Sequence, residues 1–405
     1  MKTLLQVNVA SNFGSTGRIV ENIGLLAQSQ GWNCYLAHGS RYANPTQLHD
    51  ISTGTNWEDR AHVIKSLLFD QHGLGSRKAT KGLLKAIEQI SPDIIHLHNI
   101  HGYFLNYPIL FDFLSSNKIP VIWTLHDCWP ITGHCAYFDF VHCNKWLTHC
   151  EGCPQLNTYP RAIFKDNAYN NYELKKRYFL SIKDFLHLVP VSDWLKGFYE
   201  KSFFAGCSID RIYNGIDTTL FTLSTQTDSP FIDKKKFNIL GVANIWEPRK
   251  GYSDFIRLRE LLPADFGIIM VGVSSKQLRQ LPAGITGIER TDNAQQLAQL
   301  YADADVFFNP TWQDTFPTTN LEALACGTPV ITYRTGGSPE AISEDTGFVV
   351  EQGDLSAVMT AIRSIQEKGK DFYRLKCRER AVQNFNKDIS YQKYIELYDR
   401  ILNQK

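Results

Sequence analysis

The sequence predicts an α/β protein built from two doubly wound domains. Short runs rich in β-branched residues alternate with longer stretches whose apolar residues recur at helical spacing, which is the pattern of βαβ units in a parallel sheet. This alternation occurs in both halves of the chain. The 405 residues also suffice for two domains of about 200 residues each.

The individual elements follow from this pattern. In the first half we expect strands at 3–10, 34–39, 93–98, 120–126 and 187–192, with helices such as 17–30 and 78–90. In the second half we expect strands at 237–243, 267–273, 305–310, 329–333 and 347–351, with helices that include 252–262, 294–302 and 321–326. A last helix at 389–402 carries apolar residues at three- and four-residue spacing.

These elements predict a first domain over 1–200, with a cysteine-rich insertion at 128–154. A second domain is expected over 201–385, followed by a segment, 386–405, that packs back on the first domain. The polar, turn-rich stretch 224–236 is the expected linker. Open parallel sheets bind ligands at the carboxyl ends of their strands, so we expect loops of both domains to line one cleft.

Composition excludes several classes of protein. The 42 Lys and Arg residues nearly balance the 41 Asp and Glu residues, and a net charge of +1 does not favour nucleic acid as a partner. The N-terminal segment lacks the cleavage site of a signal peptide, and no window approaches the ~18 apolar residues of a membrane span. We therefore expect a cytoplasmic protein.

Two basic runs, 175–177 and 234–236, are candidates for peripheral contact with the inner face of the cytoplasmic membrane. No clear amphipathic helix with a bulky apolar face accompanies either run. A solvated basic surface is therefore the alternative for both.

The loop after the first strand, NFGSTGR, places Gly14 and Gly17 where a helix begins. Glycine lets backbone N–H groups approach a ligand closely, and a helix N-terminus favours an anion. The loop is not G-x-G-x-x-G, and no acidic residue ends the second strand, which weakens the case for NAD. A tight turn without a ligand is the alternative.

Arg249 and Lys250 follow a predicted strand in the motif EPRKG and directly precede a predicted helix. A cation at a helix start is suited to a diphosphate, and Lys250 could meet one there. A solvated basic turn is the alternative.

Asp314 and Glu322 enclose a loop and a helix start further along the chain. We expect Thr319 or Asn320 to cap this helix and Glu322 to lie in its first turn. The two acids could hold sugar hydroxyls while the amides of the helix start hold phosphate. For Glu322, a favourable interaction with the helix dipole is the alternative.

The 314–322 block, the LEALACGTPVI that follows it, EPRKG, YNGID at 213–217 and VSDWLK at 191–196 together resemble the retaining glycosyltransferases of family 4. The resemblance spans nearly the whole chain and is closest in kind to enzymes of bacterial capsule, exopolysaccharide and O-antigen assembly. It implies the GT-B fold, in which two Rossmann-like domains face a central cleft. It also implies a nucleotide-diphosphate sugar donor, a glycan or lipid-linked acceptor and no catalytic metal.

Carried over residue by residue, the family's E-x7-E motif falls on Asp314 and Glu322. The resemblance implies that Glu322 holds the donor ribose and that Asp314 lies near the transferred sugar. Asp314 is one methylene shorter than the family's Glu. Lys250 would hold the diphosphate, whereas Asn244 stands where some members carry an Arg. Arg249 is the alternative cation, but it is adjacent to Lys250 and is expected to point elsewhere.

The resemblance implies further site residues. The family's glycine loop and the loop over the donor fall on Gly14, Gly17, Phe316, Thr318 and Thr319. His126, which ends the strand at 120–126, resembles a family histidine that contacts the donor sugar and assists transfer. A hydrogen-bonded structural histidine is the alternative for His126. His98 and His101 also follow a strand and are candidates for the acceptor side.

Five of the nine cysteines fall between Cys128 and Cys153. Four of them could bind a structural Zn²⁺, namely Cys135, Cys143, Cys150 and Cys153. A neighbouring His134, His142 or His149 could replace one of these ligands. Unliganded buried thiols and a redox C-x2-C pair are the alternatives. Cys128 lies beside His126 and is expected to line the active site.

Two other functions are compatible with the same motifs. A GT-B sugar-nucleotide epimerase would change its nucleotide sugar without an acceptor. A non-catalytic, zinc-bearing module would bind a nucleotide sugar without turnover. Product analysis with and without an acceptor distinguishes both from a transferase.

Overall fold

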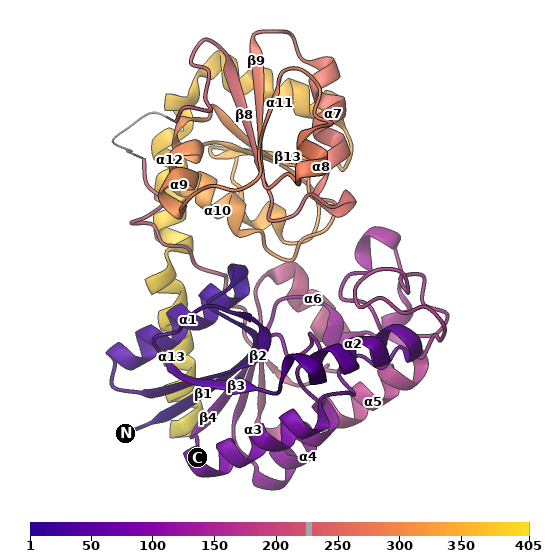
Figure 1. The fold of residues 1–405 in the computed structure, drawn as a ribbon. Helices are drawn as coiled ribbons and strands as arrows, with labels where there is room; N and C mark the ends of the chain where they lie inside the picture. Colours follow the sequence, from indigo (N-terminus) through magenta and orange to yellow (C-terminus); the bar gives the residue numbers. More distant parts are fainter. Residues whose placement is uncertain (224–228, 405) are drawn as a thin grey trace. The chain divides into compact units, whose positions relative to one another are not determined.

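The computed structural model describes residues 1–223 and 229–404 and divides the chain into two compact units (Figure 1). Unit 1 contains Met1–Tyr213 and Tyr391–Lys405, and unit 2 is Asn214–Ser390. The chain enters unit 2 after Tyr213 and leaves it after Ser390, whereas the expected domain limits were 200 and 385. Of the predicted linker at 224–236, residues 224–228 lie outside the described residues.

Unit 1 is built on a parallel sheet of order β3-β2-β1-β4-β5-β6-β7. Its strands are β1 Thr3–Ser11, β2 Asn33–Ala43, β3 His49–Thr53, β4 Ile94–Leu97, β5 Val121–Leu125, β6 Leu186–Pro190 and β7 Ser208–Ile209. Its helices are α1 Gly14–Ser29, α2 Asn56–Phe69, α3 Arg77–Ile90, α4 Tyr107–Asn117, α5 Ala168–Leu180 and α6 Asp193–Lys201, joined by most of α13 Lys387–Asn403.

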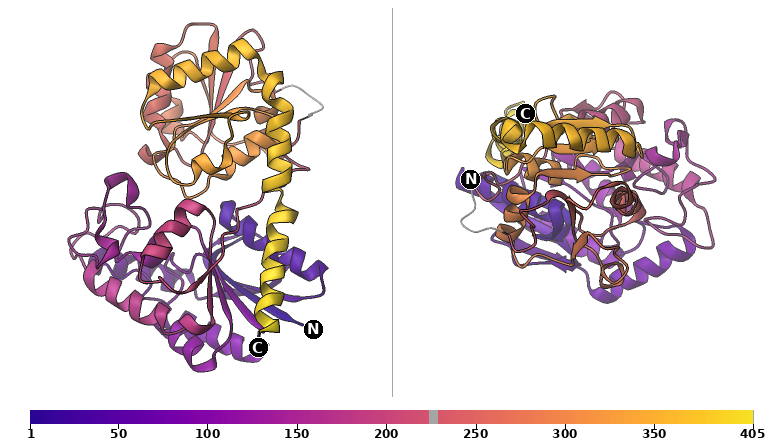
Figure 2. Two further views of the ribbon diagram at one scale, coloured as in Figure 1. Left: turned by 180° about the vertical axis from the view of Figure 1, so that it is seen from behind. Right: turned by 90° about the horizontal axis from the view of Figure 1, so that it is seen from above.

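Helices cover both faces of this sheet. On one face, Ile23 of α1 and Tyr394 of α13 share an apolar cluster with Leu4 of β1, and α13 lies along the sheet (Figure 2). On the other face, Phe111 of α4 and Phe179 of α5 pack against Trp123 of β5, with ring centroids 5.8 and 4.9 Å away. Burial on both sides explains why the central strands are almost continuously apolar.

Unit 2 is built on a second parallel sheet, of order β10-β9-β8-β11-β12-β13. Its strands are β8 Phe237–Val242, β9 Phe266–Val271, β10 Ile285–Ile288, β11 Val306–Asn309, β12 Val330–Tyr333 and β13 Gly347–Val350. Its helices are α7 Tyr252–Leu261, α8 Ser275–Leu278, α9 Ala294–Asp303, α10 Thr318–Ala325, α11 Leu355–Lys368 and α12 Lys370–Phe385.

Two adjacent residues of β11 show how this sheet fills its two cores. Phe307 packs against Tyr301 of α9 at 5.3 Å between ring centroids, whereas Phe308 packs against Phe255 of α7 at 5.2 Å. Successive side chains of a strand point to opposite faces, so this pair buries one ring on each side of the sheet.

The predicted strands are all present, but β3, β7 and β10 were not predicted. All three are edge strands: β3 and β7 are the two edges of the first sheet, and β10 is one edge of the second. An edge strand is half exposed and therefore carries no continuous apolar run; β3, for example, buries only Thr53 fully. The helix expected at 17–30 begins earlier, at Gly14, and the one expected at 321–326 begins at Thr318.

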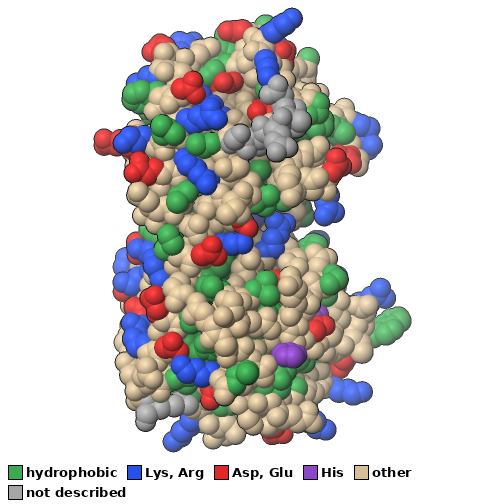
Figure 3. Space-filling model, turned by 90° about the vertical axis from the view of Figure 1, so that its left-hand side faces the viewer, with side chains coloured by type: hydrophobic (Ala, Val, Ile, Leu, Met, Phe, Trp, Pro, Cys, Tyr) green, Lys and Arg blue, Asp and Glu red, His purple; other side chains and the backbone are tan. Residues whose placement is uncertain are grey.

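The surface is mixed in charge, and basic and acidic side chains are interspersed over the face shown in Figure 3. In the basic run at 175–177, Lys176 and Arg177 are exposed, whereas Lys175 is not part of the surface. Lys175 is 1% exposed and donates hydrogen bonds to the carbonyls of Trp129 and Thr132 at 2.7 and 2.9 Å. None of the helices within 1–223 and 229–404 is long and apolar enough to cross a membrane.

Candidate functional site

The candidate site of unit 2 lies where the strand order reverses. From β8 the chain proceeds to β9 on one side, and from β11 it proceeds to β12 on the other, while β8 and β11 are neighbours. The loops after β8 and β11 therefore emerge side by side at the carboxyl edge of the sheet. This is the position at which open parallel sheets bind ligands.

The two loops bring Lys250 and Asp314 together. The Lys250 ammonium donates a hydrogen bond to Asp314 Oδ2 within an ion pair. Arg249 was expected to point elsewhere, but its guanidinium donates to the carbonyl of Gln313, the residue before Asp314, at 2.8 Å. The backbone N–H of Trp312 donates to the Arg249 carbonyl at 2.8 Å and joins the loops a second time. Of the two cations, Lys250 is thus the one beside the carboxylate.

Gly251 makes this approach possible. Its φ of 77° lies in the left-handed region, and a Cβ added there would stand 2.2 Å from the carbonyl oxygen of Pro310. Any other residue would push the loop after β8 away from the loop after β11. The motif EPRKG therefore positions Lys250 through its last residue.

Asp314 is held as an anion. Burial opposes its ionisation, but the nearby charges of Lys250 and Arg249 outweigh burial and hold the pKa of the carboxyl below its ordinary value. The backbone N–H of Phe316 also donates to Asp314 Oδ1, at 3.3 Å. The Asp314 side chain is still 17% exposed and that of Lys250 is 25% exposed, so both remain accessible to a ligand.

Helix α10 carries the second acid of the motif. Glu322 accepts a hydrogen bond from the hydroxyl of Tyr301 at 3.0 Å, and burial raises the pKa of Tyr301 well above its usual value. Tyr301 therefore remains a donor to Glu322 at neutral pH. This partner could not be predicted from the sequence, because it lies on α9 and belongs to none of the motifs.

The expected cap of α10 was wrong. The helix follows Pro317, and neither Thr319 nor Asn320 caps it. Asn320 is fully buried, and its side-chain oxygen accepts from Asn309 at 2.7 Å, which removes it from the helix end. Glu322 consequently lies one turn inside the helix rather than in its first turn.

The other donor-loop residues differ in exposure. Thr318 and Thr319 are partly exposed at the start of α10, and Asn244 is exposed just after β8. Phe316 is only 3% exposed and packs against Phe385 with ring centroids 5.8 Å apart. Phe316 therefore supports the loop from beneath.

Unit 1 gathers its predicted residues at the carboxyl edge of its own sheet. Gly14 and Gly17 form the first turn of α1, directly after β1. His126 follows β5, and its Nε2 lies 3.3 Å from Nδ1 of His98, which follows β4. Burial, assisted by the charge of His101, lowers the pKa of His126 to about 4, against the influence of Asp127. His126 is therefore a neutral imidazole at pH 7.

A second histidine nearby is paired differently. Nε2 of His101 lies 2.8 Å from Asp127 Oδ2, and its Nδ1 lies 2.9 Å from the hydroxyl of Tyr159. Asp127 directly follows His126, so this pair fixes the backbone beside the predicted catalytic histidine. Tyr159 lies outside the motifs and was not predicted.

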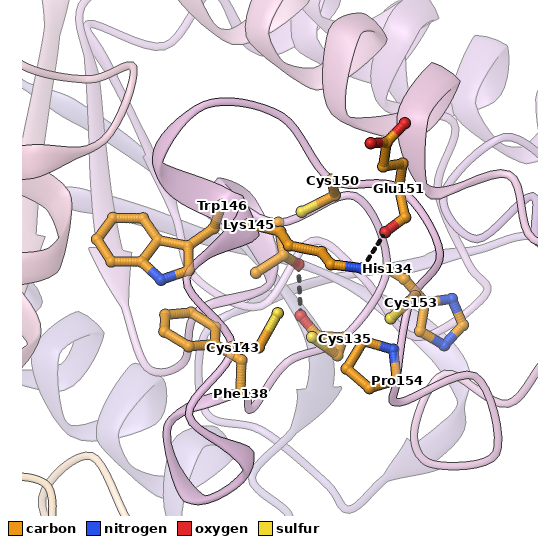
Figure 4. Close-up of a pocket in the computed structure, with 11 residues that line it drawn as sticks. His134, Cys135, Phe138, Cys143, Lys145, Trp146, Cys150, Glu151, Cys153 and Pro154 are labelled. Carbon is orange, nitrogen blue, oxygen red and sulfur yellow. Dashed lines mark hydrogen bonds between the residues drawn. The ribbon is translucent and has the colours of Figure 1, made fainter.

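The four predicted zinc ligands line one pocket of unit 1, together with His134 (Figure 4). All nine cysteines are free thiols. The thiols of Cys135 and Cys153 are hydrogen-bonded to each other, which is the largest cause of a Cys153 pKa lowered to about 7. Within the described part of the chain, no three or more His, Cys, Asp or Glu side chains form a group that could hold a metal ion as they stand.

Two protein-family models match the chain. The one described as Glycosyltransferase Family 4 matches residues 18–220, and the one described as Glycosyl transferases group 1 matches residues 236–368. Each match covers most of one half of the chain.

Among curated proteins, the chain is similar to the colanic acid biosynthesis glycosyl transferase WcaC of Escherichia coli K12. The two are 28% identical over 278 residues, which is 65% of each protein. It is also 26% identical over 180 residues to an N,N'-diacetylbacillosaminyl-diphospho-undecaprenol alpha-1,3-N-acetylgalactosaminyltransferase of Campylobacter jejuni, covering 42% of this chain and 46% of that one. The chain thus spans less than two thirds of the length of these relatives.

Among solved structures, the chain is similar to a sucrose-phosphate synthase from Thermosynechococcus elongatus. The TM-score is 0.76 at 16% identity, and the comparison covers 100% of both chains. A glycosyltransferase from Rickettsia africae gives a TM-score of 0.70, also at 16% identity, over 100% of this chain and 99% of that one. At 16% sequence identity, these similarities show a shared fold only.

Proposed function

The chain belongs to glycosyltransferase family 4, and from this premise we propose that it transfers a sugar, with retention of configuration, from a nucleotide-diphosphate sugar to a lipid-linked glycan. The predicted GT-B fold is confirmed by the two parallel-sheet units and by the likeness to solved structures. The observation that carries the proposal is the Lys250–Asp314 pair at the strand-order reversal of unit 2.

Lys250 is proposed to bind the donor diphosphate. A diphosphate offers an ammonium more negative charge than one carboxylate does, so it would compete with Asp314 for Lys250. The released Asp314 carboxylate could then accept hydrogen bonds from hydroxyls of the transferred sugar. Glu322, oriented by the Tyr301 hydroxyl, is proposed to accept from the ribose.

We propose same-face transfer, which is the mechanism that the family resemblance implies. Asp314, held as an anion by Lys250 and by the Phe316 N–H, would then bind the transferred sugar without forming a covalent bond to it. In the proposed step the acceptor oxygen bonds to the anomeric carbon as its bond to the diphosphate breaks. The departing phosphate oxygen takes the acceptor proton, and Lys250 stabilises the charge that develops there.

His126 is proposed to contact the donor sugar as a neutral imidazole. Its low pKa, caused mainly by burial, prevents a positive charge at neutral pH. A neutral imidazole can donate one hydrogen bond and accept another without opposing an oxocarbenium-like transition state. The cation in the step is then Lys250 and not His126.

A lipid-linked acceptor is supported by the relatives and by one surface of unit 1. WcaC is named for colanic acid biosynthesis, and the name of the C. jejuni relative specifies an undecaprenol-linked sugar. We define the α2 patch as six exposed side chains on α2 and on the segment beside its end: Trp57, Arg60, Ile64, Phe69, Ile163 and Phe164. We propose that this patch makes the peripheral contact with an anionic membrane surface.

The patch has the composition of an interfacial surface. Trp57 is 76% exposed, Ile64 56% and Phe164 78%, and the N–H of Ile163 donates to the carbonyl of Leu67 at 2.8 Å, which keeps the two segments together. Arg60 lies over the Trp57 ring. Exposed aromatic and aliphatic side chains beside arginine are suited to the headgroup region of a bilayer.

Donor binding is tested by thermal shift with a panel of nucleotide diphosphates and nucleotide sugars. A ligand at 100 times its Kd adds about 2.7 kcal/mol to the free energy of unfolding, which a melting curve resolves. Lys250→Ala and Glu322→Ala are expected to remove most of the shift, whereas the exposed controls Lys276→Ala and Glu260→Ala are expected to keep it. Full shifts in both site variants would contradict the donor site.

Turnover is tested by product analysis with and without a glycan acceptor. Transfer requires the acceptor and yields a free nucleoside diphosphate. A changed nucleotide sugar formed without acceptor would instead identify an epimerase, and donor binding with no product under either condition would identify a binding module.

A further inference from the structure

We propose that the cysteine pocket of unit 1 binds a structural Zn²⁺ through the thiolates of Cys135, Cys150 and Cys153 and the imidazole of His134. The sequence alone favoured a fourth cysteine, Cys143. The structure supplies a better fourth donor. Zinc occupancy of this pocket can be measured without any assay of sugar transfer.

The surroundings of the His134 imidazole point to a metal. It is 2% exposed and lines the pocket with the cysteines (Figure 4). Its Nδ1 lies 2.5 Å from Asp70 Oδ1, and within the described residues its buried Nε2 has no hydrogen-bond partner. A carboxylate at one ring nitrogen makes that nitrogen the N–H donor and leaves a lone pair on the other. Metal-ligating histidines are held in this way.

Backbone amides donate hydrogen bonds to two of the sulfur atoms. The N–H of Gly133 hydrogen-bonds to the sulfur of Cys150, and that of Gln155 to the sulfur of Cys153. Amide donors of this kind stabilise a thiolate, which is the form that binds zinc. Only glycine fits at position 133, because a Cβ there would lie 2.0 Å from the carbonyl oxygen of Ala168.

Burial separates the two candidates for the fourth position. Cys135 is 6% exposed and Cys150 is 9% exposed, and both lie as deep in the fold as His134 does. Cys143 and Cys153 are both only partly buried. We assign the fourth bond to His134 Nε2 because it is buried and has no hydrogen-bond partner within the described residues.

Binding requires the side chains of the pocket to move. In 1–223 and 229–404, no three His, Cys, Asp or Glu side chains form a group that could hold an ion as they stand. A positive charge is already in place, since the Lys145 ammonium lines the pocket and donates to the carbonyls of Glu151 and Gly152 at 2.7 and 2.8 Å. It would offset the negative charge of a zinc–thiolate centre.

The site would fix a segment that has little regular structure. Between Cys128 and Cys153 the chain forms only single-turn 3-10 helices, at Trp129–Ile131, Asp139–Val141 and Lys145–Leu147. Long segments without regular structure need some other constraint, and a metal would supply one. The Cys128 N–H donates to the Ala136 carbonyl at 3.1 Å, which links this segment to the strand end that carries His126.

The test measures zinc in the full chain under reducing conditions. The protein is stripped with a chelator and titrated with Zn²⁺ against a chromophoric competitor, and Co²⁺ is used as a second probe. We expect about one equivalent of zinc, a thiolate charge-transfer band with Co²⁺ and a higher melting temperature with zinc. Less than about a tenth of an equivalent in the wild type would overturn the site.

Variants test the ligand set. Cys153→Ser and Cys135→Ser are expected to lose stoichiometric zinc, and Cys207→Ser, which removes a thiol outside the pocket, is expected to keep it. His134→Gln should lose zinc and His134→Cys should restore it. Zinc retained in His134→Gln but lost in Cys143→Ser would overturn the assignment of His134. A Cys135–Cys153 disulfide in wild-type protein purified without reductant and holding no zinc would identify a redox pair instead.

Discussion

At the scale of single residues, the site of unit 2 depends on one departure from the family motif. Asp314 stands where the family carries Glu, and the shorter side chain still reaches the Lys250 ammonium because Gly251 lets the two loops approach. The ion pair and the Phe316 N–H keep Asp314 ionised although it is largely buried. The charge of this residue, and not its length, is therefore what the local structure maintains.

Substitution of Asp314 separates charge from reach. Asp314→Asn keeps the shape but removes the charge that pairs with Lys250, so we expect turnover to fall by about 10²-fold or more while the protein stays folded. Asp314→Glu keeps the charge and extends its reach by one methylene, so we expect it to retain donor binding and change the preference among nucleotide sugars. Steady-state rates with a common acceptor are the measurement. Wild-type turnover in Asp314→Asn would show that the carboxylate takes no part in transfer.

At the scale of elements, α2 is unusual because its outer face is not polar. Trp57 and Ile64 are seven residues apart and so lie on the same face of the helix, and Phe69 ends it. The opposite face buries His62 and Ser66 against the rest of unit 1. An ordinary surface helix has a polar outer face and an apolar inner face, whereas α2 exposes apolar side chains and buries polar ones. This distribution is expected where the outer face meets a membrane.

Vesicle binding tests the α2 patch. Wild-type protein is expected to float with vesicles that contain phosphatidylglycerol and to remain unbound with neutral phosphatidylcholine vesicles. A Trp57→Glu/Ile64→Glu double variant should lose most of the binding, because it removes apolar area and adds charge that anionic lipid repels. The control is Leu375→Glu on α12, a side chain that is 70% exposed outside the patch. Equal flotation of the double variant and the control would exclude the patch.

At the scale of the whole molecule, buried histidines make stability depend on pH. Burial lowers the pKa of both His62 and His126 from 6.5 to about 4. The folded protein therefore binds fewer protons at these two groups than the unfolded chain does between those values. Stability is fully present above about pH 6.5 and is lost as the pH falls toward about 4.

Chemical denaturation at several pH values measures this effect. Each of the two histidines contributes about 1.4 kcal/mol per pH unit within the window, so the free energy of unfolding should fall clearly between pH 7 and pH 5. His126→Gln is expected to reduce that slope by about one histidine's share. The exposed His149→Gln is the matched control for removal of an imidazole. A free energy of unfolding that is constant over this range would contradict the burial of these groups.

The sequence determined the two parallel sheets, because central strands buried on both faces must be continuously apolar and their carboxyl ends must carry the functional loops. It also determined which side chains the motifs present there, with Lys250 and Asp314 as the clearest pair. Only the tertiary structure decided the partners. Tyr301 orients Glu322, Asp70 pairs with Nδ1 of His134, and Tyr398 lies 2.7 Å from a ring nitrogen of His96, 302 positions earlier in the chain. Such partners lie on different elements, and their meeting depends on how helices pack on a sheet, which local sequence patterns do not encode.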